Sequence, residues 1–169
     1  GMALDLVDGL SSAPTEHAAV LGVEELFRVL LAPRAVTFHL TPRDEGAAGG
    51  SPPTSSPLSA AQLAELRSRR FLPHDRAGGF WLSVRSRDLD VGVIEVEGVA
   101  LPQHLDRYVN LALTIAPICA LATNRARIAE ELSAEVAEQT RVSRELRQRN
   151  AELLEAHERI KVLSGIVPI

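Results

Sequence analysis

The sequence predicts an α+β fold, a small antiparallel sheet with flanking helices, followed by a long C-terminal helix. Apolar residues recur every three or four positions between residues 15 and 31, as on one face of a helix. They alternate with polar residues in the segments 35–40, 80–87 and 91–99, as in half-buried strands. The segment 125–161 has no Gly, Pro or aromatic residue and balances eight cations with eight anions, which is typical of a solvated helix.

The composition excludes several classes of protein. The 169-residue chain is 46% hydrophobic, which is too apolar for wholesale disorder. Its single cysteine, Cys119, cannot form an internal disulfide, and we expect a buried, inert thiol. With 18 cations against 22 anions, the chain is not a basic nucleic-acid module. No apolar run reaches about 18 residues and no signal peptide is recognisable, so we expect no membrane span and a cytoplasmic location.

We expect two main parts and two short terminal pieces. Residues 1–14 are predicted to be a tag remnant and an N-terminal extension that either lengthens the first helix or folds back on the domain. Residues 15–124 form the predicted compact domain, which holds eight of the ten prolines and all the aromatic residues. Residues 125–165 form the predicted coiled-coil helix, and 166–169 read as the truncated start of a further segment.

The first half of the domain is predicted as a helix, a strand and a loop. The helix begins near Pro14 and ends before Pro33, because proline suits the first turn of a helix and cannot continue one. The strand that follows places Val36 on one face and His39 on the other. Residues 41–57 are rich in Gly, Pro and Ser, and we expect a long, mobile loop there.

A short helix with its own start signal is predicted next. Ser59 and Gln62, three residues apart, have the pattern of a capping box, in which each side chain accepts a hydrogen bond from the other residue's backbone N–H. Leu58 and Leu63 stand where a hydrophobic staple would fix the entry of the chain. The chain leaves this helix in extended form from Phe71.

The two strands 80–87 and 91–99 are predicted to form an antiparallel hairpin about a short acidic turn. Trp81 and Arg85 share the more polar face of the first strand. With His39 on the polar face of its own strand, they are the candidate ligand-binding residues, and a face that is solvated or covered by a helix is the alternative. The acidic and histidine residues of this region lack the spacing of metal ligands, so we expect no metal site and no required cofactor.

A long helix is predicted from Pro102 to Leu163, ended by Ser164 and Gly165. Pro117 falls inside it. An interior proline removes one backbone hydrogen bond and clashes with the preceding turn, so we expect a kink there.

The second half of this helix has a heptad stripe that predicts a parallel homodimer. One row contains Leu132 and recurs every seven residues. Two partner rows compete: one includes Arg149, the other Asn150, and a buried asparagine at such a position fixes the register of a parallel dimer. A solvated single helix and an antiparallel pair are the alternatives. The expected dimer contacts are Leu132, Leu146, Asn150, Leu153, Ile160 and Leu163.

The stretch 90–132 resembles the C-terminal part of GAF domains. It contains GVIEVEGV, where the family has a GVLEV-type hairpin strand, and the family's next helix has an LA…IA…ALxNARLxEEL pattern. The matching tail here is 126–132, with Arg125 at the family's asparagine and Asn124 one place earlier. The helix after it, residues 144–163, is similar to the signalling helices that link sensors to output domains in bacterial regulatory proteins. Three or four predicted strands, against the usual six, indicate a reduced GAF-like domain.

The resemblance implies a non-catalytic sensor and dimerisation module of a bacterial signal-transduction protein. Such a module relays a signal along its coiled coil to an output domain that follows it, and it has room for a small-molecule ligand that the resemblance does not identify. Two alternatives stay open, a purely structural dimerisation module without a ligand and a PAS-like sensor. No set of nucleophile, base and orienting residue can be assembled, so we expect no enzyme.

Overall fold

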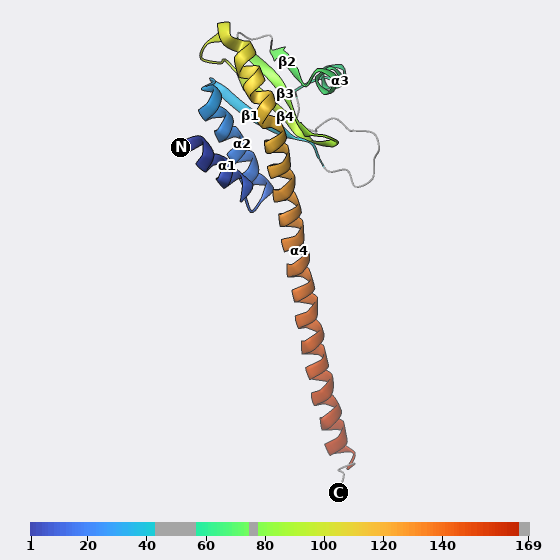
Figure 1. The fold of residues 1–169 in the computed structure, drawn as a ribbon. Helices are drawn as coiled ribbons and strands as arrows, with labels where there is room; N and C mark the ends of the chain where they lie inside the picture. Colours follow the sequence, from blue (N-terminus) through green and yellow to red (C-terminus); the bar gives the residue numbers. More distant parts are fainter. Residues whose placement is uncertain (43–56, 75–77, 166–169) are drawn as a thin grey trace. The chain divides into compact units, whose positions relative to one another are not determined.

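The computed structural model describes residues 1–42, 57–74 and 78–165, and it confirms the α+β fold with a small antiparallel sheet and a long C-terminal helix (Figure 1). The predicted loop 41–57 therefore lies largely outside the described residues, and so does the segment 166–169. In chain order the elements are α1 (Met2–Ser11), α2 (Glu16–Leu31), β1 (Ala35–Leu40), α3 (Ala60–Arg69), β2 (Phe71–His74), β3 (Gly79–Ser86), β4 (Leu89–Glu97), the 3₁₀ turn η1 (Pro102–His104) and α4 (Leu105–Leu163).

The four strands form one antiparallel sheet in the order β1-β4-β3-β2. The predicted hairpin is its centre, and the extended chain from Phe71 becomes the edge strand β2. At the other edge, the Glu24 side chain on α2 accepts a hydrogen bond of 2.9 Å from the backbone N–H of Phe38. This bond satisfies one backbone donor on the open edge of β1 that would otherwise be free to pair with another strand.

One face of the sheet is the main core, and it is covered by α2 and the first part of α4. Alternate residues of β1, β3 and β4 point to it, as the sequence alternation predicts. The fully buried members with the largest side chains include Phe27 on α2, Phe80 and Leu82 on β3, and Ile94 on β4. From α4 this core receives mostly small side chains, Val109, Ala112, Ala116, Cys119, Ala120, Ala122 and Ala126.

The opposite face of the sheet is covered in part by α3. The capping box of Ser59 and Gln62 is formed as predicted, with both reciprocal hydrogen bonds present. The staple residues Leu58 and Leu63 are both buried, in a second and smaller apolar cluster. The other members of that cluster are Leu66, Leu72, Trp81 and Val93.

The N-terminal extension folds back on the domain as a separate helix, α1, and does not lengthen α2. Its buried Leu10 packs where Gly22 on α2 has no side chain, and a Cβ on Gly22 would lie 3.1 Å from Leu10 Cδ1. The segment predicted as an extension therefore contributes to the core.

Helix α4 includes Pro117 without an interruption of its helical assignment. Bending of the helix at that residue stays a prediction. One turn earlier, the Thr114 hydroxyl donates to the carbonyl of Asn110 at 2.8 Å, a type of back-bond that often accompanies bent helices.

The helical segment Pro102–Leu163 also contains an 18-residue stretch with a mean hydropathy of 1.3, which is apolar and long enough to cross a membrane. This differs from the expectation that no run reaches that length. One third of the stretch is buried inside the protein, and a core helix of a soluble protein passes the same test of composition. The finding is therefore weak support for a membrane span.

The chain divides into two compact units, Gly1–Ala129 and Glu130–Ile169. The first unit extends past the expected boundary at residue 124 because Ala126 and Arg127 are buried in it. The Arg127 Nε donates to Glu16 Oε2 at 2.5 Å, and its Nη2 donates to the carbonyl of Thr41 at 3.0 Å. This contact joins α2, the residue after β1 and α4, three segments that are far apart in the sequence.

Replacing Glu16 with alanine is expected to lower the free energy of unfolding by about 2 kcal/mol, because the buried Arg127 guanidinium loses its carboxylate partner. Urea unfolding followed by circular dichroism measures the change. Glu25→Ala is the matched control: Glu25 pairs with Arg28 on the same helix, but both side chains are about half exposed, so a change within about 0.5 kcal/mol is expected. Equal losses in the two variants would contradict the importance of the Arg127 contact.

Candidate functional site

Four polar or aromatic side chains meet on the face of the sheet that carries Trp81. Glu95 is central because strand pairing places Thr37 of β1 and Trp81 of β3 directly on either side of it. His39 comes from β1 and His74 from the end of β2. Sequence reasoning finds His39 and Trp81 from the alternation of their strands, but it sets His74 and Glu95 aside because they lack the spacing of metal ligands.

One carboxylate stands between two imidazoles. His74 Nε2 lies 3.0 Å from Glu95 Oε1 at hydrogen-bond distance, and His39 Nε2 lies 3.6 Å from Glu95 Oε2. The side chains of His39, His74 and Glu95 are 14%, 12% and 15% exposed, so the group is largely withdrawn from water. The Nε2 atom of His39 is fully buried and makes no hydrogen bond within the part of the chain that the structure describes.

Trp81 holds the two imidazoles in place. The ring of His74 stacks on the indole with centroids 5.5 Å apart and an angle of 21° between the planes. The ring of His39 is tilted by 35° at 6.1 Å from the same indole. Because Trp81 is the only tryptophan of the chain, its fluorescence reports on this group alone.

Gly79 on β3 lies between β2 and β4, and its lack of a side chain lets residues of those two strands approach each other. A Cβ on Gly79 would lie 2.6 Å from the carbonyl oxygen of Val96 and 3.0 Å from the Cβ of His74. With no side chain there, the ligand atoms of His74, Glu95 and Glu97 lie within 4.8 Å of one another. These three residues are therefore able to hold a metal ion, although their spacing in the sequence suggests none.

The structure separates Arg85 from His39 and Trp81. A register shift in the pairing of β3 with β4 falls between Val84 and Arg85, but the extra residue, Val91, belongs to β4, so the alternation along β3 continues. The Arg85 guanidinium instead donates to the carbonyl of Arg67 at 3.1 Å. It lines a separate hollow of about 470 Å³ with Arg67, Ser68, Arg70, Ser86, Arg87 and Pro117.

Guanidinium groups bind carboxylates and phosphates in paired hydrogen bonds. An anion held by Arg85 would therefore bind in this hollow and not beside Trp81. Arg67 already has a carboxylate neighbour, Asp90, whose Oδ2 lies 3.6 Å from its Nε.

Cys119 is fully buried in the main core and has no disulfide partner. Burial raises the pKa of its thiol to about 12. Because the thiolate is the nucleophilic form, the residue is poorly suited to chemistry at neutral pH, in agreement with the expected inert thiol.

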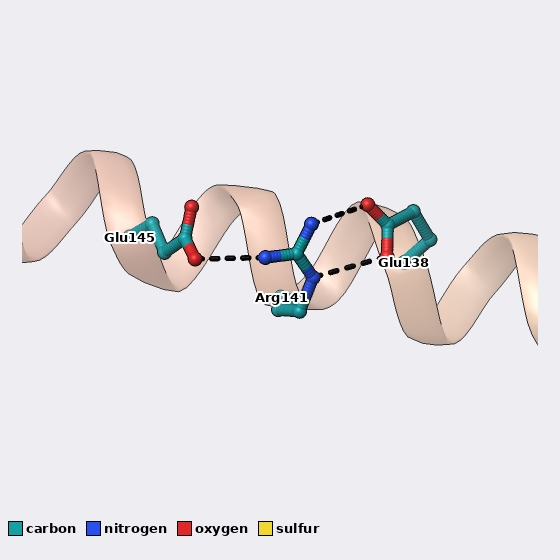
Figure 2. Close-up of polar contacts among 3 residues, drawn as sticks. All are labelled: Glu138, Arg141 and Glu145. Carbon is teal, nitrogen blue, oxygen red and sulfur yellow. Dashed lines mark hydrogen bonds and ion pairs between the residues drawn. The ribbon is translucent and has the colours of Figure 1, made fainter.

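In the second unit, α4 carries a ladder of ion pairs along one side. Arg141 is held between two glutamates: its Nη2 and Nε donate to Glu138 at 2.6 and 3.0 Å, and its Nη1 donates to Glu145 at 2.8 Å (Figure 2). The guanidinium lowers the pKa of the exposed Glu138 carboxyl. Further along, Gln148 donates to Glu152 and Arg159 to Glu155. The expected dimer contacts Leu132, Leu146, Leu153, Ile160 and Leu163 are all more than half exposed.

No protein-family model and no curated protein sequence matches the chain. Among solved structures, the native GAF domain of the potassium sensor histidine kinase KdpD from Escherichia coli is similar to it, with a TM-score of 0.54 and 16% sequence identity. The alignment covers 79% of this chain and 96% of that domain. The likeness shows that the chain has a GAF-like fold.

The Cys119 thiol is expected to resist alkylation by iodoacetamide in the folded protein at pH 8, because almost none of it is thiolate when its pKa is about 12. In urea it should react at the rate of an ordinary cysteine, whose pKa is near 9. Mass spectrometry at timed intervals measures both rates. Raising the pH above 9 should destabilise the fold, since the unfolded thiol then ionises first. Equal alkylation rates with and without urea would contradict the burial.

Proposed function

We propose that this chain is a non-catalytic sensor and dimerisation module of a cytoplasmic bacterial signalling protein. In this proposal, two copies associate in parallel through α4 and relay a conformational change along it to an output domain. The GAF-like fold supports the proposal, because the similar domain belongs to a sensor histidine kinase. A purely structural dimer without a ligand is the alternative.

The observation that carries the proposal is an exposed apolar stripe with a seven-residue repeat on α4. In the second unit it contains Leu132, Leu146, Leu153 and Ile160, between 56% and 66% exposed. A row of large apolar side chains left in water on a solvated helix favours association with another helix. The simplest partner with a matching stripe is a second copy of the chain.

The same seven-residue phase is already present in the first unit. Leu111 and Ile118 precede Leu132 by multiples of seven residues, and both are exposed, at 37% and 44%. Leu121 and Ile128 flank this row and are also exposed. The surface that we propose for dimerisation therefore includes the α4 residues of the domain itself as well as those of the predicted coil.

The ion-pair ladder favours one of the two competing seams. Glu138, Arg141 and Glu145 lie at two heptad positions that are opposite the row containing Asn150. The ladder would flank the row containing Arg149, where part of it would be desolvated on dimerisation. We therefore propose that Asn150 lies in the seam of the second unit. In the first unit the exposed flanking residues Leu121 and Ile128 belong to the row that contains Arg149. We therefore propose that the two seams differ little in free energy, so that a signal shifts the equilibrium between them.

Disulfide cross-linking of single-cysteine variants tests the dimer and its register, in a Cys119→Ala background. Asn150→Cys is expected to cross-link to itself faster than Arg149→Cys, because a seam position brings the two copies of a residue together. Gln148→Cys, on the ladder, is the control and should cross-link slowest. The products are separated on non-reducing gels after mild oxidation, at protein concentrations where light scattering reports a dimer.

The outcomes distinguish the two seams and test the parallel arrangement of the helices. Fast linkage at residue 149 and slow linkage at 150 would keep the parallel dimer and overturn the chosen seam. No linkage between identical residues at 146, 149, 150 or 153 would overturn the parallel dimer.

A further inference from the structure

We propose that His74, Glu95 and Glu97 bind a divalent transition-metal ion on the Trp81 face of the sheet, with His39 as a fourth ligand. The proposal concerns the domain alone and is independent of whether α4 dimerises. It rests on four groups that come from three strands and meet in one partly buried place.

The distances are close to those that a metal ion needs. Zn²⁺ binds imidazole nitrogen and carboxylate oxygen at about 2.0–2.2 Å, which places neighbouring ligand atoms roughly 3.3 Å apart in a tetrahedral site. His74 Nε2 and Glu95 Oε1 are 3.0 Å apart, and the atoms of all three principal ligands lie within 4.8 Å.

His39 provides a second observation that points to the same place. Its Nε2 is buried, faces Glu95 Oε2 at 3.6 Å and has no hydrogen bond within the described residues. A buried imidazole nitrogen without a partner costs free energy, and an ion held by the Glu95 carboxylate would provide the partner. Glu95, with one oxygen toward each histidine, would bind the ion between the two imidazoles.

The surroundings also fit a bound ion. Gly79 leaves the strand between β2 and β4 without a side chain, so His74 reaches Glu95 and Glu97 across it. The stacked Trp81 ring fixes the orientation of the His74 imidazole, which reduces the entropy lost when the ion binds. Side-chain exposures of 12–15% for the two histidines and Glu95 keep the site accessible but largely dry.

The donor set selects the class of ion. Two imidazoles and two carboxylates suit Zn²⁺, Fe²⁺, Mn²⁺ or Co²⁺, whereas Ca²⁺ and Mg²⁺ prefer sites made only of oxygen. The competing interpretation is a structural hydrogen bond between His74 and Glu95 that binds no ion. The two interpretations differ in their dependence on Glu97, which the structural pair does not need.

Titration of the untagged, EDTA-treated full chain with Co²⁺ tests the proposal through the fluorescence of Trp81. Bound Co²⁺ is expected to quench this single tryptophan at a stoichiometry of one ion per chain, which metal analysis after desalting measures independently. Zn²⁺ should displace Co²⁺ and restore the fluorescence, while Mg²⁺ and Ca²⁺ at the same concentration should not.

The variants identify the ligands. His74→Ala and Glu97→Gln are each expected to weaken Co²⁺ binding at least tenfold, and His104→Ala, which removes an exposed histidine of η1, should leave it unchanged. Glu97→Gln preserves size and shape, and far-ultraviolet circular dichroism checks that each variant is folded. Absence of Co²⁺ binding, or equal binding by the Glu97→Gln and His104→Ala proteins, would overturn the proposal.

Discussion

The packing of small side chains from the first part of α4 against the sheet is the contact on which the rest of the domain depends. Ala112, Ala116 and Cys119 are buried at 0–3% exposure in the same core as Phe27 and Phe80. Small residues let the helix backbone approach the sheet closely, so the bulky aromatic and branched residues of α2 and the strands fill the remaining space. A larger side chain at any of these α4 positions would push the helix off the sheet.

This close packing leaves the other side of the same helix in water, with Leu111 and Ile118 exposed. In this segment of α4 the residues that face the core are small and large apolar residues face outward. In an ordinary amphipathic helix the large apolar residues face the core. That reversal explains why the segment is apolar enough to pass a compositional test for a membrane span while contributing to a core. It is also the physical basis of the proposed dimer.

The face of the sheet that carries Trp81 differs from the core face because polar side chains occupy part of it. Here α3 and a small apolar cluster occupy one part of the surface, and the part beside them carries Glu95 between two histidines. Polar groups that are largely withdrawn from water need partners, and here His74 pairs with Glu95 while the Nε2 of His39 makes no hydrogen bond within the described residues. A role in binding gives this arrangement of polar groups an explanation that packing alone does not.

The sequence by itself determined the class of fold, the capping box of α3, the hairpin and the ends of α4, because local periodicity and capping chemistry fix each of these over a few residues. Only the tertiary structure decided that the N-terminal segment packs back on α2, that Arg85 contacts α3 and lines a hollow of its own, and that Arg127 is buried against Glu16. The same holds for the group of His74, Glu95 and Glu97, whose spacing along the chain gives no sign of a common site. These features depend on which strands become neighbours and on what lies between them, and in the sheet that order is β1-β4-β3-β2. Contacts between residues far apart in the chain are set by this pairing, so no local pattern can reveal them.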